Sequence, residues 1–294
     1  MSASRTHAVT APDGRALAVL EGGARDGAAI VAHHGTPGSG RLYRTESESA
    51  ERLGLRLITY DRPGYGESSP QPGRSIADCA ADVAAILDAL GVERFATYGT
   101  SGGGPHALAC AAQLPERCAA AATIAGVGPD DAPDLEFLAG MGEGNLAEFG
   151  AAAESREALT AYCEGDAAAI LSVGPEQLAE ALRPHLSEVD AAALTGELAA
   201  FLHASFVAAL APGVDGWVDD DLAFLAPWGF DVGAIEVPTL VRQGEQDLMV
   251  PPDHGRWLRA HVAGADGAIL AGEGHLTLFV NRIGDIQVWL RDRL

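Results

Sequence analysis

Short apolar runs alternate with segments of helical periodicity along the first 127 residues. Runs at positions 28–32, 56–60, 95–98 and 119–127 have the length and apolar character of buried strands. Between them, residues 42–53 and 75–90 are typical of helices, and the second is opened by a capping box from Ser75 to Asp78 and ended by Gly91. Strands and helices that alternate through short links predict a parallel sheet with helices on both faces. Two more strands, 6–11 and 16–20, flank a turn as a hairpin.

The pattern changes at residue 128 and returns near residue 238. From 128 to about 215 the chain is rich in Ala, Leu and Glu and has helical periodicity without any strand-like run. Residues 179–186 and 191–206 are candidate amphipathic helices. Strands are expected again at 238–242 and 267–270, and helices at 253–262 and 278–294. The sequence therefore predicts an α/β core that is interrupted by a long helical insertion.

The stretch 95–112 carries the clearest candidate chemistry. An apolar strand leads into G-T-S-G-G, which matches G-x-S-x-G with Ser101 at its centre, and an alanine-rich helix follows. A serine on so sharp a turn has strained backbone, so the residues two before and two after it have to be small, as Gly99 and Gly103 are. The helix behind the turn directs free N–H groups at negative charge formed near Ser101. We predict that Ser101 is a catalytic nucleophile.

A serine nucleophile requires a base and a group that orients the base, and both are expected at later strand ends. Asp247 follows the expected strand 238–242, and His275 follows the expected strand 267–270. We therefore predict the catalytic triad Ser101, Asp247 and His275.

Other acids and histidines lie near these positions. Asp253 is interpreted as a helix N-cap, whereas Glu245 stays open as an alternative orienting acid. His254 and His261 fall in an expected helix and are interpreted as surface residues. His106 is interpreted as a first-turn residue of the nucleophile helix that can also line the pocket.

Four motifs occur in a fixed order along the chain: H-G-x-P from His34, D-x-x-G-x-G-x-S from Asp61, G-x-S-x-G around Ser101, and G-x-x-D with a later G-H, ending at Asp247 and His275. Together they resemble the α/β-hydrolase fold superfamily, in which the order Ser, Asp, His is usual. The resemblance implies a mostly parallel central sheet flanked by helices. It further implies that residues 1–127 and 229–294 form the hydrolase core and that residues 128–228 form a helical cap.

An oxyanion hole is also expected, because the attacked carbonyl oxygen needs two donors. The backbone N–H of Gly102, the residue after the nucleophile, is one, and the resemblance implies that the N–H of Thr36 is the other. The motif from Asp61 to Ser68 is interpreted as a structural turn without chemistry of its own. His34, His106 and Trp217 are candidate substrate-binding residues.

These residues predict a serine hydrolase that cleaves an ester, thioester or amide of a small molecule through an acyl-enzyme, with carboxylesterase as the first expectation. Epoxide hydrolases and haloalkane dehalogenases, which the chain resembles in H-G-x-P, use aspartate where this chain has Ser101. A proline-iminopeptidase-like aminopeptidase is an alternative, although the G-G-S-W-G elbow of those enzymes is absent. A ligand-binding or non-hydrolytic protein of the same fold is another.

Composition gives expectations about the size of the core, about membrane and metal binding, and about the cellular compartment. The 294 residues are 48% hydrophobic, enough for one large core with an insertion. No run of about 18 apolar residues occurs, so no membrane span is expected, and residues 1–10 lack the features of a signal peptide. No ligand cluster with metal spacing occurs, so neither metal nor cofactor is expected. We expect a cytoplasmic protein whose four cysteines are buried thiols: Cys79, Cys110, Cys118 and Cys163.

Charge is the last informative feature. All 19 basic residues are arginine and the net charge is −22, a balance that repels nucleic acid and anionic membranes. The expected partner is a small-molecule substrate, and the oligomeric state stays open. Residues 128–235 contain 20 acids and two arginines, a balance of −18. Most of these acids are expected on solvated helix faces, but one group predicts a site for a substrate cation: Trp217, Asp219, Asp220 and Asp221.

Overall fold

The computed structural model describes residues 4–294, and its strands form one eight-stranded sheet in the order β1-β2-β4-β3-β5-β6-β7-β8. Strands β1 and β2 pair antiparallel, as do β2 and β4, and all other neighbours are parallel. The mostly parallel α/β-hydrolase sheet expected from the sequence is therefore confirmed. Residues 1–3, which open the expected core segment, lie outside the described residues. The strands are β1 (Arg5–Thr10), β2 (Ala16–Gly23), β3 (Ala28–His33), β4 (Leu55–Tyr60), β5 (Phe95–Thr100), β6 (Cys118–Ile124), β7 (Thr239–Gly244) and β8 (Asp266–Leu270).

The parallel strands are buried on both faces, which explains why they appear in the sequence as continuous apolar runs. Successive side chains of a strand point to opposite faces. In β3, Ala29 and Val31 belong to one hydrophobic cluster, whereas Ile30 and Ala32 belong to the other. The chain therefore builds two core layers, one on each side of the sheet.

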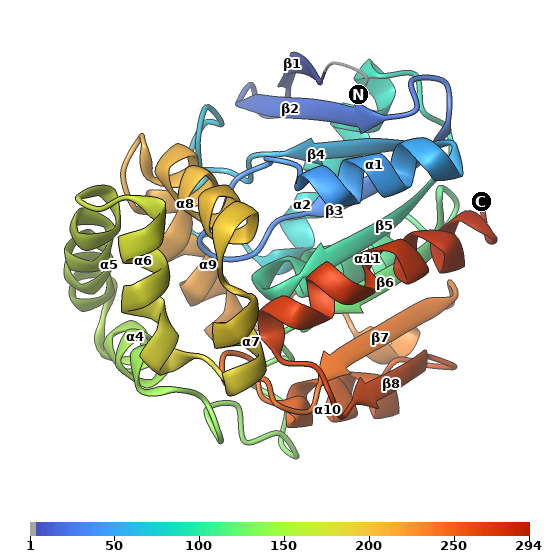
Figure 1. Cartoon of the computed structure of the whole chain (residues 1–294). Coiled ribbons are helices and arrows are strands. Elements are labelled where there is room, and N and C mark those ends of the chain that lie inside the picture. Colours follow the sequence, from blue (N-terminus) through green and yellow to red (C-terminus); the bar gives the residue numbers. More distant parts are fainter. Residues whose placement is uncertain (1–3) are drawn as a thin grey trace.

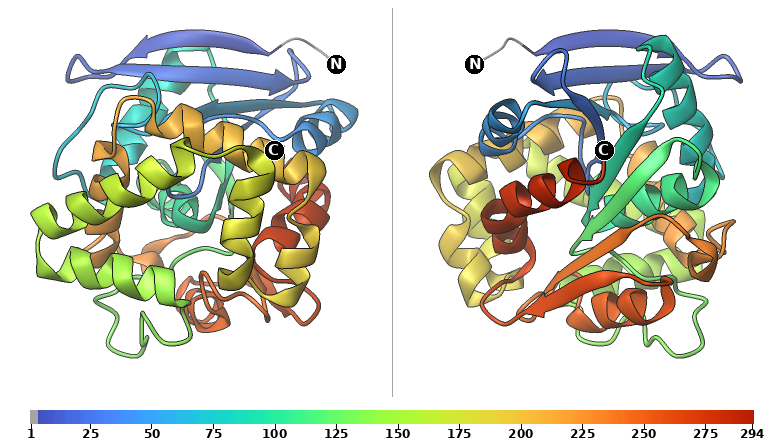
Figure 2. Two further views of the ribbon diagram at one scale, coloured as in Figure 1. Left: turned by 60° about the vertical axis from the view of Figure 1, so that its left-hand side comes forward. Right: turned by 90° about the vertical axis from the view of Figure 1, so that its right-hand side faces the viewer.

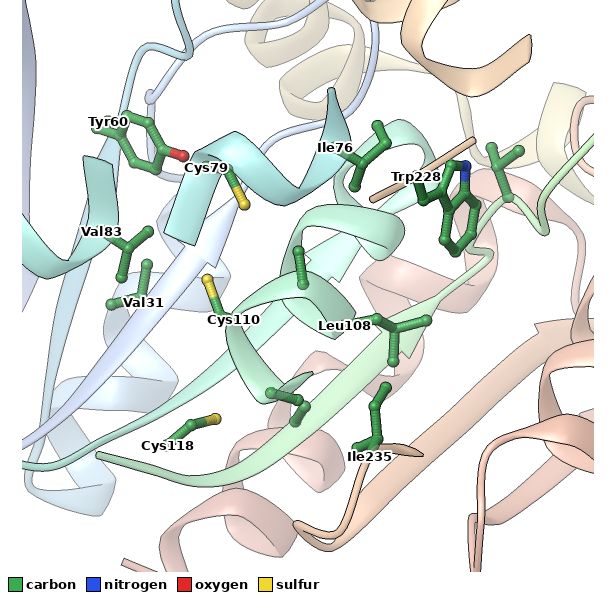
Figure 3. Packing of buried hydrophobic residues seen from close by; sticks show 14 of the residues in the cluster. Val31, Tyr60, Ile76, Cys79, Val83, Leu108, Cys110, Cys118, Trp228 and Ile235 are labelled. Carbon is green, nitrogen blue, oxygen red and sulfur yellow. The ribbon is translucent and has the colours of Figure 1, made fainter. Parts of the chain in front are cut away.

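Helices cover each layer, as the alternating pattern predicts. Helices α2 (Cys79–Ala89), α3 (Gly104–Gln113) and α10 (Pro252–His261) pack on the first face, and Figure 3 shows Val83 of α2 and Leu108 of α3 in that layer. Helices α1 (Arg44–Leu53) and α11 (His275–Arg291) pack on the second face, in front of the sheet in Figure 1. The four cysteines are free and buried, as expected. Three of them lie in the layer of Figure 3.

The chain between β6 and β7 contains helices and no strand, and its helices gather on one side of the sheet (Figures 1 and 2). They form an apolar cluster that includes Leu159, Cys163 and Trp217, together with Tyr65 from the chain after β4. No single helix of residues 4–294 has the length and apolar character needed to cross a membrane; α8 and α9 meet these limits only as a pair bent by 96°. The helices are α4 (Glu143–Glu154), α5 (Arg156–Leu171), α6 (Pro175–Leu182), α7 (Glu188–Ala193), α8 (Gly196–Leu210) and α9 (Asp215–Leu225).

Several expected helices differ from the structure at their ends, among them the helix expected at 179–186, which is Pro175–Leu182. The single helix expected at 191–206 is two helices, because the chain breaks after α7 and Gly196 takes a left-handed φ of +48°. The last helix begins at His275, three residues before the expected start. Helix α10 begins at Pro252 with Pro251 as its N-cap, so the interpretation of Asp253 as the N-cap was wrong. Asp253 is an exposed first-turn residue paired with Arg256 at 2.6 Å.

Candidate active site

Ser101 occupies a strained turn between β5 and α3. Its φ is +56°, in the left-handed region that a residue with a side chain rarely adopts. Two glycines make the turn possible, because a Cβ atom on Gly99 would collide with the carbonyl of Gly103, and one on Gly103 would collide with the carbonyl of His33. The strained backbone directs a small, half-buried hydroxyl out of the end of the sheet, the geometry of a nucleophile elbow.

His275 and Asp247 meet at the next two strand ends. The Nδ1 atom of His275 lies 2.8 Å from Oδ2 of Asp247, and both side chains are buried. Asp247 is itself held, since its Oδ1 accepts from the backbone N–H groups of Met249 and Val250 at 2.9 Å each, and its Oδ2 accepts from Gln243 at 3.0 Å. Burial alone would lower the pKa of His275, but the charge and hydrogen bond of Asp247 outweigh it and raise that pKa above its ordinary value.

One cavity of about 720 Å³ brings the candidate residues together. Ser101, His275, Thr36 and Gly102 all line it, and most of its remaining wall is apolar. Asp247 is not among the lining residues, because it lies behind His275. The helical insertion supplies much of the opposite wall, including Phe149, Leu178, Leu202, Phe206 and Phe224.

The two expected oxyanion donors lie on facing loops beside Ser101. The N–H of Thr36 has no hydrogen-bond partner among the described residues, and Gly102 lies in the first helical turn, where N–H groups lack intrahelical partners. A Cβ on Gly35 would come within 3.4 Å of the Ser101 Cβ, so the backbone there passes close to Ser101. A Cβ on Gly102 would collide with the Thr36 hydroxyl. The glycines thus allow both loops to approach a reacting carbonyl.

A buried ion pair that the sequence analysis missed supports this loop. Arg62 donates through Nη2 to Asp220 at 2.6 Å and to the carbonyl of Gly35 at 3.1 Å, and it also bonds the carbonyl of His34. The Thr36 hydroxyl donates to the same Asp220 at 2.7 Å. Arg62 belongs to the motif interpreted as a structural turn. Its partner lies 158 residues away, so no local pattern in the sequence indicates the contact.

The three candidate substrate-binding residues have different positions. His34 lines the cavity, but its Nε2 accepts from the N–H of Arg62 at 3.1 Å and its Nδ1 bonds the carbonyl of Gly35 at 2.8 Å. His106 is buried and is not a lining residue; its Nδ1 donates to the carbonyl of Gly102 at 2.8 Å, and burial lowers its pKa to about 3. Trp217 lines the cavity. His106 therefore supports the turn that carries Ser101, whereas His34 and Trp217 line the cavity.

The alternative acid, Glu245, and the alternative histidines, His254 and His261, do not line the cavity of Ser101. Glu245 is exposed on the protein surface, as is His261. The interpretation of His254 as a surface residue was wrong, since it is fully buried and bonded to the N–H of Gly128 at 3.0 Å and the carbonyl of Phe137 at 2.8 Å. It lies on the apolar face of α10 and ties the start of the insertion to the core.

Two of the three aspartates of α9 that were expected to bind a substrate cation are paired with arginines. Asp219 pairs with Arg156 at 2.7 Å, and Asp220 pairs with Arg74 at 2.8 Å in addition to Arg62. Both carboxylates are buried and neutralised, so they are unavailable to a substrate cation. Among residues 4–294, no group of three or more His, Cys, Asp or Glu side chains is placed to hold a metal ion.

Comparisons with known proteins agree with this architecture. Residues 28–153 match the family model for the alpha/beta hydrolase fold. The chain is 37% identical over 123 residues to a non-heme chloroperoxidase of Streptomyces lividans, 33% over 98 residues to epoxide hydrolase B of Mycobacterium tuberculosis, and 32% over 117 residues to a bifunctional esterase/perhydrolase of Acinetobacter calcoaceticus. These matches cover 41%, 32% and 40% of this chain, and 45%, 28% and 42% of the relatives, so the chain matches less than half the length of each.

The solved structures extend the likeness to the whole fold. A bromoperoxidase from Bacillus anthracis superposes with a TM-score of 0.72 and 20% identity, covering 99% of this chain and 100% of the other. At that identity the likeness concerns the fold alone. With the eight-stranded sheet and the matched segment, it shows that the chain has the α/β-hydrolase fold.

Proposed function

We propose that this protein is a serine hydrolase that cleaves an ester of a small molecule through an acyl-enzyme. The observation that carries the proposal is the shared cavity, in which a strained Ser101 lies with a histidine oriented by a buried carboxylate. A hydroxyl becomes a competent nucleophile only beside a base, and the base needs an orienting partner. Ser101, His275 and Asp247 are the residues proposed for these roles.

The proposed mechanism assigns each group one task. The Nδ1–H of His275 donates to Asp247, which leaves Nε2 free to take the proton of Ser101 as its oxygen attacks the carbonyl carbon. The backbone N–H groups of Thr36 and Gly102 stabilise the oxyanion. His275 then gives the proton to the leaving alcohol, and water, activated by the same histidine, releases the acid. The raised pKa of His275 suits this sequence, because the imidazolium formed in the first step is stabilised.

The insertion at 128–228 is proposed as the cap that selects the substrate. Its helices supply much of the apolar cavity wall, so a substrate with an apolar acyl or alcohol part is favoured. Thioesters and amides, including aminoacyl amides of the proline-iminopeptidase kind, share the same acyl chemistry and are the alternatives. An epoxide hydrolase is disfavoured despite the relative of that name, because this chain has Ser101 at the position where epoxide hydrolases of this fold use aspartate.

Perhydrolysis is a second candidate, favoured by the relative named a bifunctional esterase/perhydrolase. The same acyl-enzyme would be attacked by hydrogen peroxide in place of water, so that the acyl–Ser101 bond breaks and a peracid leaves. Adding peroxide to an ester assay and measuring the oxidation of a halide by the peracid separates this activity from simple hydrolysis.

A fluorophosphonate probe followed by a panel of p-nitrophenyl esters tests the main proposal. We expect the probe to modify Ser101, as read by peptide mass spectrometry, and the panel to show turnover that Ser101→Ala removes. A folded protein without labelling would contradict the proposal and favour a ligand-binding role. Labelling with turnover of aminoacyl amides alone would favour the aminopeptidase alternative.

A further inference from the structure

The three consecutive aspartates of α9 do not share one environment. Asp219 and Asp220 are paired with arginines, as described above, but among residues 4–294 no arginine lies within ion-pair distance of Asp221. Asp221 is 1% exposed, and its Oδ2 receives no hydrogen bond from any N–H or hydroxyl group of the described chain. A buried carboxylate without a partner is costly. Asp221 is therefore the one of these three aspartates that no arginine neutralises, and its neighbour is another carboxyl group, that of Glu148.

Asp221 lines the cavity of Ser101 and has Glu148 of α4 as its acidic neighbour. Glu148 is half-buried and also lines the cavity, and its Oε1 accepts from Trp217 Nε1 at 2.6 Å. Tyr162 and the exposed Asp166 of α5 complete this part of the wall. The group thus combines carboxyls that no arginine neutralises with two aromatic rings in a mostly apolar pocket, a chemistry that attracts cations.

The charges around Glu148 and Asp221 also favour a cationic ligand. Burial and the neighbouring Glu148 raise the pKa of Asp221 well above its ordinary value, and Arg74, already bonded to Asp220, opposes this only weakly. Burial likewise raises the pKa of Glu148. The one arginine among the described cavity-lining residues, Arg41, is exposed. A ligand that brings a positive charge would pair both carboxyls and remove the cost of burying them.

We propose that Glu148 and Asp221 form a subsite that binds a positively charged ammonium group of the substrate, within the cavity that holds Ser101. As a statement about substrate class it rests on the proposed hydrolase function. It also replaces the expectation that Asp219, Asp220 and Asp221 act together, because the arginines occupy the first two. The proposed substrates are esters that carry an ammonium group on an apolar spacer.

A binding experiment tests the subsite without any turnover. Hexylammonium and its neutral isostere hexan-1-ol are titrated into the wild-type protein by calorimetry at low salt. We expect hexylammonium to bind at least about tenfold more tightly, and Glu148→Gln and Asp221→Asn each to remove most of that preference. Glu154→Gln is the matched control, because Glu154 is an exposed acid on the same helix as Glu148 and does not line the cavity. It should keep the preference.

A kinetic experiment then links the subsite to catalysis. p-Nitrophenyl esters that end in a trimethylammonium group are compared, at several chain lengths, with isosteres that end in a tert-butyl group. We expect one chain length to show the highest ratio of kcat/KM for the charged over the neutral ester, and 1 M salt to reduce that ratio. Equal affinities for hexylammonium and hexan-1-ol, or equal losses in the Glu154→Gln control, would overturn the proposal. Failure to turn over any ester would contradict the hydrolase function and leave the binding result to decide the subsite.

Discussion

Asp190 accepts a hydrogen bond from the backbone N–H of His275, with 2.6 Å between Oδ2 and the nitrogen, although Asp190 belongs to α7 of the helical insertion. Its Oδ1 accepts from the N–H groups of Leu276 and Thr277 at 2.9 Å each. Gly274 leaves room for this carboxylate, since a Cβ there would collide with it. A side chain from the insertion therefore caps the helix that carries the proposed base, and this explains why α11 begins at His275.

Asp190→Asn is expected to lower the pKa of His275. The negative charge of Asp190 contributes to raising that pKa, so its removal destabilises the imidazolium. The acid limb of kcat/KM should move to lower pH, and the imidazole signals of His275 should titrate at lower pH by NMR. The amide keeps one acceptor oxygen, but its NH2 group cannot accept from a backbone N–H, so the free energy of unfolding should also fall by about 1 kcal/mol.

Glu188→Gln is the matched control for this substitution. It removes the same charge from the same helix, but Glu188 is exposed and makes no contact with α11 among the described hydrogen bonds. Its His275 titration should coincide with that of the wild type. If Asp190→Asn lowers stability and leaves the His275 titration unchanged, Asp190 is a structural cap and does not tune the base.

The pH dependence of activity follows from the same histidine. The base acts in its neutral form, so kcat/KM should rise with pH as His275 loses its proton. The midpoint should lie above the ordinary histidine value of about 6.5, because Asp247 raises the pKa more than burial lowers it. Asp247→Asn should reduce kcat by about 10⁴-fold by disturbing the tautomer. A rate that stays flat from pH 5 to 8 would contradict a histidine base.

Substitutions of Ser101 separate activity from strain. Ser101→Ala should lower kcat by about 10⁴-fold or more while the fold persists. Ser101→Gly should abolish activity equally and raise the free energy of unfolding by about 1 kcal/mol, since glycine accepts the φ of +56° without the cost that a Cβ brings. Urea unfolding of the three proteins measures this difference. A glycine variant no more stable than Ser101→Ala would show that the turn is not strained.

Local signals explain which features the sequence could predict. Strands β3 to β6 are predicted from continuous apolar runs, and Ser101, Asp247 and His275 each follow a predicted strand. The contacts that sequence analysis missed join distant positions: Asp190 to His275 across 85 residues, and Arg62 to Asp220 across 158. The local sequence around a single acid in a helical insertion is the same whether that acid is exposed to solvent or buried. Only the fold shows which acids of the insertion face the core.

Asp220 is expected to be the most sensitive of those acids. It is fully buried, and Arg62 and Arg74 hold its pKa well below the ordinary value despite the opposing effect of burial. Asp220→Asn would leave the buried Arg62 without its counter-charge, a loss that typically costs about 3–5 kcal/mol, and would leave Arg74 with Asp219 alone, 3.4 Å away. It would also release the Thr36 hydroxyl, and with it the loop that carries a proposed oxyanion donor. We therefore expect a lower free energy of unfolding together with a lower kcat.

Asp215→Asn provides the control for Asp220, because Asp215 is an exposed acid in the first turn of the same helix. It should change the free energy of unfolding by less than about 0.5 kcal/mol. Urea unfolding and ester kinetics on both variants distinguish the two roles of Asp220. A loss of stability with unchanged kcat would show that Arg62 alone holds the loop of Thr36. Unchanged stability would contradict the buried ion-pair network itself, since a buried charge that loses its partner cannot be without cost.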